Sequence, residues 1–130
     1  MADAQCAPAG RYVAASGTVY DTRTKLTWQQ TAPSPTYTWA DAKTHCAGVG
    51  ASLGGAGWRL PTVKELQTIV DDSTTNPSMD ATVFPAPPDY DFWSSSPVAD
   101  SSSYAWRVNF GYGTTFCVDV SRMYLVRCVR

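Results

Sequence analysis

Apolar and polar residues alternate over several short stretches of this chain, and the pattern takes a helical period in only two places. The first alternating stretch, RYVAASGTVYDTRTKLTWQQ at 11–30, predicts short strands separated at Gly17 and at the polar turn 21–25. TAPSPT at 31–36 holds two prolines, which exclude regular strand pairing, so it is expected to be a loop.

The last third of the chain alternates again. YAWRVNF at 104–110 and TTFCVDV at 114–120 predict two strands joined by GYG at 111–113 into a hairpin. Their expected inward residues are Tyr104, Trp106, Val108, Phe110, Phe116, Val118 and Val120. DFWSSS at 91–96 predicts another strand, and YLVRCVR at 124–130 is apolar on both faces, which is typical of a central strand.

The first helical pattern is TWADAKTHCAGVG at 38–50. Thr38 is placed to cap it, and Asp41 lies three residues later, where a carboxylate stabilises the exposed N–H groups. Trp39, Ala42 and Cys46 share one face, and a glycine at 48 or 50 ends the helix.

The second helix is predicted to begin after GWRLP. Thr62 and Glu65 form a capping box, and the proline before them keeps the preceding residue extended. We expect Trp58 and Leu60 to fill the core, and Arg59 to pair with Glu65 or Asp71.

Two further stretches have no regular pattern. Residues 51–57 are expected to be a flexible loop, and residues 71–90 an irregular segment rich in aspartate and proline. An aspartate-rich loop raises the possibility of calcium, but the spacing does not match the EF-hand pattern. No cofactor is therefore predicted, and calcium stays possible without support from a motif.

These patterns predict an α+β domain, with two helices packed on antiparallel sheets. The chain of 130 residues suits one domain at 11–130 preceded by a tail at 1–10. No apolar run reaches the roughly 20 residues of a membrane span. The start lacks the basic and apolar regions of a signal peptide, although a mature chain with an added methionine is equally compatible.

Charge excludes one class of partner. The net charge is −1 and the cations are scattered, so nucleic-acid binding is not expected. Arg122, Arg127 and Arg130 form a mild cluster that we interpret as a solvated strand face. Five Trp and seven Tyr leave some aromatic side chains for a sugar-stacking or protein-binding surface once the core is filled.

Four widely spaced cysteines predict two disulfides and hence an oxidising compartment. Four cysteines allow three connectivities, and the residues alone do not choose between them. A structural zinc site is not expected, because Cys6, Cys46, Cys117 and Cys128 show no close pair.

The sequence gives no pattern for catalysis. The single histidine, His45, lies on a helix beside a cysteine, and the serines at 94–96 lack the context of a nucleophile elbow. Asp89, Asp91 and Asp119 have no spacing specific to a glycosidase, so they are interpreted as solvated acids. A binding module is favoured over an enzyme.

Several of these stretches occur together in one order, with W-R-L-P-T-x-x-E-L at 58–66 and V-R-C-V-R at 126–130 as the most specific. They resemble the Lcl C-terminal domain family, formerly a domain of unknown function of bacterial surface and secreted proteins. The resemblance implies a C-type-lectin-like fold related to formylglycine-generating enzymes, with the first helix beside a sheet made from both chain ends. It further implies a Cys46–Cys128 disulfide, which leaves Cys6 to pair with Cys117.

The resemblance also implies a function. One adhesin of the family binds sulfated glycans, and similar domains vary surface residues around the last strands to change ligand. The calcium–sugar motifs of true C-type lectins and the paired active-site cysteines of formylglycine-generating enzymes are both absent here.

We therefore expect a non-catalytic binding module, secreted, periplasmic or on the cell surface, that recognises a glycan or another cell-surface ligand. The expected ligand residues are Trp93, Ser95, Arg107, Asn109, Tyr112, Asp119, Arg122 and Tyr124. Two alternatives are a diversified protein-binding surface, with Ser121 among its variable positions, and a structural role in a trimeric fibre tip or other homo-oligomer.

Overall fold

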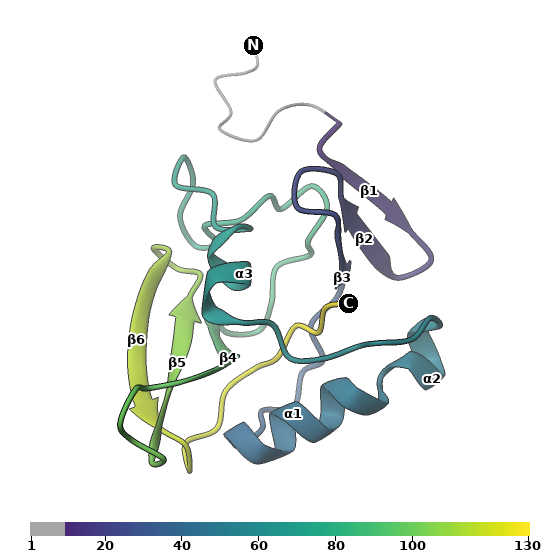
Figure 1. Ribbon diagram of the computed structural model, residues 1–130. Coiled ribbons are helices and arrows are strands. Elements are labelled where there is room, and N and C mark those ends of the chain that lie inside the picture. The colour runs from purple at the N-terminus through teal and green to yellow at the C-terminus, as the bar shows by residue number, and fades with distance from the viewer. Residues whose placement is uncertain (1–9) are drawn as a thin grey trace.

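Two separate antiparallel sheets and three helices make up the fold in the computed structural model, which describes residues 10–130 (Figure 1). The first sheet has the order β1-β2-β3 and the second the order β4-β5-β6. The strands are β1 (Tyr12–Ala15), β2 (Thr18–Asp21), β3 (Leu26–Gln29), β4 (Asp91–Pro97), β5 (Tyr104–Asn109) and β6 (Thr114–Asp119). The helices are α1 (Trp39–Gly48), α2 (Gly50–Leu53) and α3 (Val63–Gln67). The predicted α+β class is confirmed.

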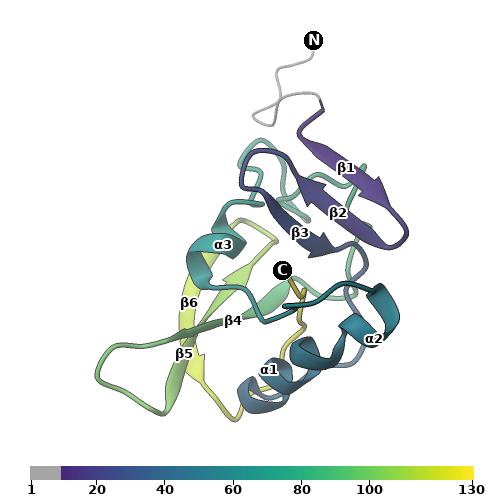
Figure 2. The ribbon, with the colours of Figure 1, turned by 45° about the vertical axis from the view of Figure 1, so that its right-hand side comes forward.

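The C-terminal segment 124–130 joins the two sheets. On one side it runs parallel to β4, where Trp93 N–H donates to Leu125 O and Leu125 N–H donates to Asp91 O. On the other side Val129 pairs with Trp28 of β3, and the chain end exchanges two hydrogen bonds with Thr27. Figures 1 and 2 show this yellow segment passing through the middle of the molecule. It is central, as predicted, but it makes isolated bridges and not a continuous strand.

The hydrophobic core has two parts, one on each face of the β4-β5-β6 sheet. Leu66 and Ile69, from α3 and the residues just after it, pack with Phe92 and Val108 on one face. On the other face, Ala42 and Cys46 of α1 pack with Trp93, Ala105 and Val126. Each face of the sheet is therefore covered over part of its area, and Trp58 and Leu60 are buried as expected.

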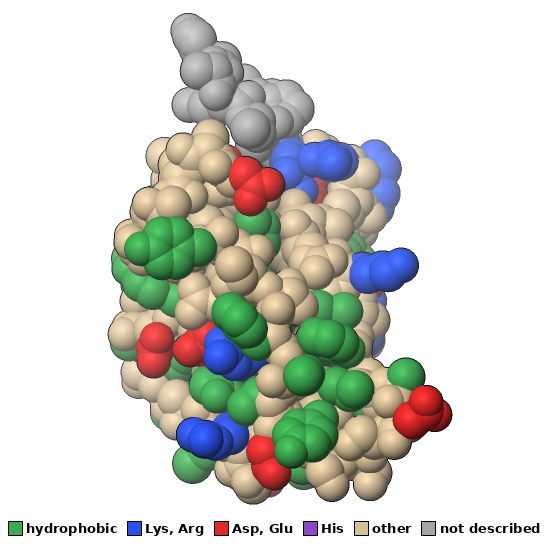
Figure 3. Space-filling view, turned by 90° about the vertical axis from the view of Figure 1, so that its left-hand side faces the viewer, with side chains coloured by type: hydrophobic (Ala, Val, Ile, Leu, Met, Phe, Trp, Pro, Cys, Tyr) green, Lys and Arg blue, Asp and Glu red, His purple; other side chains and the backbone are tan. Residues whose placement is uncertain are grey.

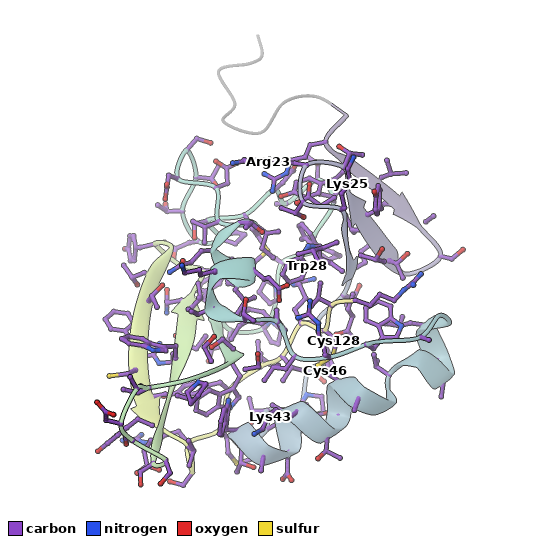
Figure 4. All side chains as sticks on the ribbon, in the orientation of Figure 1. Arg23, Lys25, Trp28, Lys43, Cys46 and Cys128 are labelled. Carbon is purple, nitrogen blue, oxygen red and sulfur yellow. A yellow bond between two sulfur atoms is a disulfide. The ribbon has the colours of Figure 1, made fainter. Side chains whose placement is uncertain are left out.

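A disulfide between Cys46 and Cys128 ties α1 to the C-terminal segment (Figure 4). The two Cα atoms lie 5.3 Å apart, and both residues are fully buried. This is the pairing that the family resemblance implied. Cys117 is exposed and has no sulfur partner among residues 10–130. Cys6, its expected partner, lies outside the described residues, so the second disulfide stays a prediction.

Both helix starts follow the predicted capping. The Thr38 hydroxyl accepts from Asp41 N–H at the start of α1. At α3 the capping box is complete: Thr62 accepts from Glu65 N–H, and the Glu65 carboxylate accepts from Thr62 N–H at 2.9 Å. The Arg59 guanidinium donates to both oxygens of the same carboxylate, at 2.6 and 2.7 Å. Arg59 therefore pairs with Glu65, which links the extended backbone before α3 to its first turn.

The interpretation of Arg127 as part of a solvated face is wrong. Its side chain is 0% exposed and lies over the rings of Phe84 and Phe92. The guanidinium donates to the backbone carbonyls of Gln29, the last residue of β3, and of Gln30, which follows it. Burial without a carboxylate partner lowers the pKa of Arg127 to about 9. Arg127 thus connects the C-terminal segment to the end of the β1-β2-β3 sheet through hydrogen bonds to two backbone carbonyls.

Two loop predictions also need correction or refinement. The expected flexible loop at 51–57 begins with a helical turn, because α2 extends over Gly50–Leu53 directly after α1. Residues 71–90 contain no helix or strand, as expected, but hydrogen bonds from Asn76 and Ser78 backbone N–H groups to the carbonyls of Gly111 and Phe110 fix the segment to the β5–β6 turn.

Removing the Cys46–Cys128 disulfide by a double substitution to alanine should lower the free energy of unfolding by about 4 kcal/mol. The bond closes a loop between residues 82 positions apart, and cross-links of this length restrict the unfolded chain strongly. Urea unfolding of the C46A/C128A variant measures the loss. S102A is the control and should change the value by less than about 0.5 kcal/mol, because Ser102 is exposed in the loop before β5.

The Arg59–Glu65 pair should make the free energy of unfolding depend on pH in the acidic range. The hydrogen bonds from Arg59 and Thr62 hold the pKa of Glu65 below its usual value, so its contribution is present above about pH 4.5 and is lost as pH falls through the lowered pKa. E65Q keeps the cap but loses the charge. Its deficit, up to about 1 kcal/mol at neutral pH, should shrink as pH falls below about 4.5 and Glu65 becomes protonated. A deficit that stays constant with pH would contradict this account.

Candidate ligand-binding surface

Three polar side chains meet on one face of the β4-β5-β6 sheet. The strand register places Asp91 of β4 directly opposite Asn109 of β5, and Arg107 two residues along on the same face. The Asp91 carboxylate accepts from the Arg107 guanidinium and, at 2.8 Å, from the Asn109 amide. The Asn109 oxygen accepts from Gly111 N–H at 2.8 Å, which ties the group to the β5–β6 turn. All three side chains are partly exposed, so they form a fixed polar cluster that solvent reaches.

Two aromatic rings border this cluster. The Arg107 guanidinium carbon lies 4.8 Å from the ring centroid of Phe116 and 5.0 Å from that of Tyr124. Phe116 faces Arg107 because the two residues are partners in the β5–β6 register. The planar cation thus lies against two aromatic faces, and this contact holds both rings near the polar groups. We call Asp91, Arg107, Asn109, Phe116 and Tyr124 the sheet-face cluster.

The predicted sugar-stacking role of Trp93 is wrong. Its side chain is 0% exposed and belongs to the core between the sheet and α1. Its indole N–H donates to the Tyr37 carbonyl at 2.7 Å, and its ring meets Tyr124 edge-on at 5.2 Å. Trp93 therefore packs against Tyr124 from the core and is too deeply buried to contact a ligand.

The other predicted ligand residues lie around the cluster and not within it. Tyr112 is 70% exposed at the β5–β6 turn. Asp119 and Arg122 lie in the turn after β6, where the Asp119 carboxylate accepts from the Ser121 hydroxyl and N–H. These two hydrogen bonds lower the pKa of Asp119. Ser95 is half-buried and donates its N–H to the Pro61 carbonyl. The structure therefore brings together Arg107, Asn109 and Tyr124 from the predicted set.

Residue alternation missed two members of the cluster and misplaced several neighbours. Phe116 was predicted to point inward but is 46% exposed, and Tyr104, also assigned to the inward face, is 45% exposed. The reason is that α3 covers only part of one face, whereas the other face is covered near Ala105 by α1 and left open near Phe116. Asp91 was interpreted as a solvated acid; the signal for its role is its register opposite Asn109. Figure 3 shows hydrophobic side chains interspersed with Arg or Lys and Asp or Glu on the β6 side of the molecule.

Residues 17–130 match the family model of the Lcl C-terminal domain. The chain belongs to the Lcl C-terminal domain family. A search of curated proteins finds no relative that matches this chain.

The sheet-face cluster of this Lcl C-terminal domain offers the hydrogen-bonding groups of Asp91, Arg107 and Asn109. Within residues 10–130, no group of three or more His, Cys, Asp or Glu side chains is arranged to hold a metal ion. His45 stacks on Tyr37 with ring centroids 4.8 Å apart. In the same range, no helix has the length and apolarity needed to cross a membrane.

Arg107 and Asp91 should be energetically coupled. R107M keeps the length of the side chain but removes the donors to the carboxylate, and D91N weakens the acceptor. Each substitution should cost about 1–2 kcal/mol of unfolding free energy, and the R107M/D91N double variant should cost less than their sum by about 1 kcal/mol. Urea unfolding of the four proteins gives this coupling. Strict additivity would mean that the two groups do not depend on each other.

Proposed function

We propose that this domain is a non-catalytic carbohydrate-binding module, and that the sheet-face cluster is its binding site. The observation that carries the proposal is the Arg107 guanidinium, which lies between Phe116 and Tyr124 and is fixed by Asp91. Sugars present both apolar C–H faces and hydroxyl groups. An exposed aromatic ring beside fixed polar groups matches both properties.

The expected binding mode follows from the unused hydrogen-bonding capacity. A sugar ring would lie on the exposed face of Phe116, and its hydroxyls would bond to Arg107, Asn109 and the second Asp91 oxygen. The Asp91 Oδ2 atom accepts from no other described residue, and Asn109 uses one of its two amide hydrogens on Asp91. Because the three polar groups already hold each other in place, little side-chain conformational freedom has to be lost on binding.

The proposal extends to fold and location. We infer a C-type-lectin-like arrangement, related to formylglycine-generating enzymes, and the disulfide from the first helix to the C-terminal segment supports it. The same disulfide supports an extracytoplasmic location, since such bonds persist in oxidising compartments. Calcium is not part of the proposed binding mode, because the sheet-face cluster contains a single carboxylate.

Protein recognition is the second candidate function. Exposed hydrophobic side chains occur around the hairpin, with Tyr112 in its turn and Met123, which is 56% exposed, in the segment that follows. Exposed aromatic residues and Met are enriched at protein interfaces. The partner surface would then include the positions expected to vary, among them Asp119, Ser121 and Arg122.

A glycan array probed with and without EDTA tests the first candidate. We expect binding that EDTA leaves unchanged. F116A should weaken it by roughly 3- to 10-fold, which is the range expected for loss of one aromatic contact. V13A is the matched control, since Val13 is 53% exposed on β1 in the other sheet. Absence of binding to any glycan would refute the proposal, as would equal weakening by F116A and V13A.

A further inference from the structure

A cavity of about 590 Å³ lies outside the sheet-face cluster, between the chain before β1 and the irregular segment 71–83. In Figure 1 these segments lie at the upper end of the molecule, near the N-terminal end of β1. None of the residues predicted from the sequence to bind a ligand lines this cavity. Its volume falls within the 300–1,000 Å³ that is usual for small-ligand sites.

Two carboxylates line the cavity, and each keeps one oxygen unused. The Asp71 Oδ1 atom accepts from the N–H and hydroxyl of Ser73, at 2.9 and 2.5 Å. The Asp80 Oδ1 atom accepts in the same way from Thr82, at 3.0 and 2.5 Å. Both Oδ2 atoms accept from no other described residue. Each carboxylate is therefore oriented by its own turn and still has an oxygen for a ligand.

The cation nearest to these groups is already engaged. Arg11 also lines the cavity, but its Nε and Nη2 atoms donate to the buried Asp21 carboxylate at 2.9 and 2.8 Å. Its Nη2 atom donates in addition to the Thr68 carbonyl. Arg11 and Asp21 neutralise each other, so the charge of Asp71 and Asp80 is left uncompensated by this residue.

A second cation lies nearby without pairing. Arg23 lines a small adjoining cavity of about 50 Å³ together with Asp71 and Asp80 (Figure 4). Among the described residues it forms no ion pair with either carboxylate. Arg23 therefore reduces the negative potential of the cavity but does not occupy the carboxylate oxygens.

The pKa of the Tyr12 phenol is raised by burial and by the nearby carboxylates. Burial, helped by the carboxylates of Asp21, Asp80 and Asp71 and opposed by Arg11, raises the pKa of Tyr12 to about 12. Tyr12 also lines the cavity, as do Met79 and Val83, and the Arg11 guanidinium carbon lies 4.7 Å from the centroid of its ring. The cavity thus combines an aromatic and apolar wall with a negative potential.

Hydroxyl groups complete the lining. Thr74 and Thr75 line the cavity beside the two carboxylates. An aromatic wall, several hydroxyls and two oriented carboxylates together match a ligand with C–H faces, hydroxyl groups and a positive charge. A simple cation would leave the aromatic wall unused, and a neutral sugar would leave the carboxylates without a charged partner.

We propose that this cavity binds a sugar with a free amino group, with its ammonium on Asp71 and Asp80 and its ring against Tyr12. This site goes beyond the proposed function, since it neither includes nor requires the sheet-face cluster. The amine would donate to the two free Oδ2 atoms, and the hydroxyls of the sugar would bond to the threonines.

Calorimetric titration with a glucosamine tetramer tests the proposal, at about pH 6, where its amines are protonated. The N-acetylated tetramer is the matched probe, which keeps the rings and hydroxyls but has no charge. We expect the free-amine tetramer to bind at least 10-fold more tightly. The D71N/D80N variant should remove this preference, because asparagine keeps the turn-forming oxygen but not the charge. If the double variant fails to fold, D80N alone should reduce the preference by several fold.

Two further variants separate this site from the other features. R23Q should strengthen binding of the free-amine tetramer by a few fold, because it removes a competing positive charge. F116A should leave that binding unchanged, whereas it weakens any glycan bound at the sheet-face cluster. The two proposals can therefore fail independently.

Several outcomes would overturn the cavity assignment. Equal binding of the two tetramers would exclude recognition of the amine. Unchanged affinity in both D71N/D80N and D80N would place the amine elsewhere. Equally tight binding of tetralysine would show a general cation site with no use for the sugar ring, and displacement of the tetramer by calcium but not by magnesium at equal concentration would show a metal site.

Discussion

The structure depends on one segment, the last seven residues, which are hydrogen-bonded to both sheets at once. Backbone bonds connect it to β4 on one side and to β3 and Arg59 on the other. The two sheets share no strand, so this segment is what holds them in a fixed relation. The disulfide from Cys128 to α1 adds a covalent link to the same segment. Residues 125–129 are all buried, as this position requires.

This arrangement buries the guanidinium of Arg127, which is unfavourable for a charged group. At the end of β3, the backbone carbonyls of Gln29 and Gln30 accept hydrogen bonds from the Arg127 guanidinium. The charge has no carboxylate nearby, and its Nε and Nη2 atoms donate to no described residue. The rings of Phe84 and Phe92 compensate in part, since aromatic faces attract cations.

Local features of this fold could be predicted from the sequence because their causes are local. Both caps, the Arg59–Glu65 pair and the β5–β6 hairpin depend on residues at most fifteen positions apart. The exposure of Phe116 and the burial of Trp93 could not be predicted in this way. Alternation separates the two faces of a strand, but which part of each face is covered depends on α1 and α3, which come from distant parts of the chain. The role of Arg127 was missed for the same reason, since its acceptors lie almost a hundred residues earlier.

The central place of the final residues has a consequence for biosynthesis. Neither part of the core can close until this segment is in place, because Leu125 and Val129 belong to one part and Val126 and Cys128 to the other. Until then β3 and β4 each present an unpaired edge, and such edges associate readily with other chains. Folding of this domain must therefore wait until residues 124–130 have been synthesised, and the nascent chain needs protection from aggregation up to that moment.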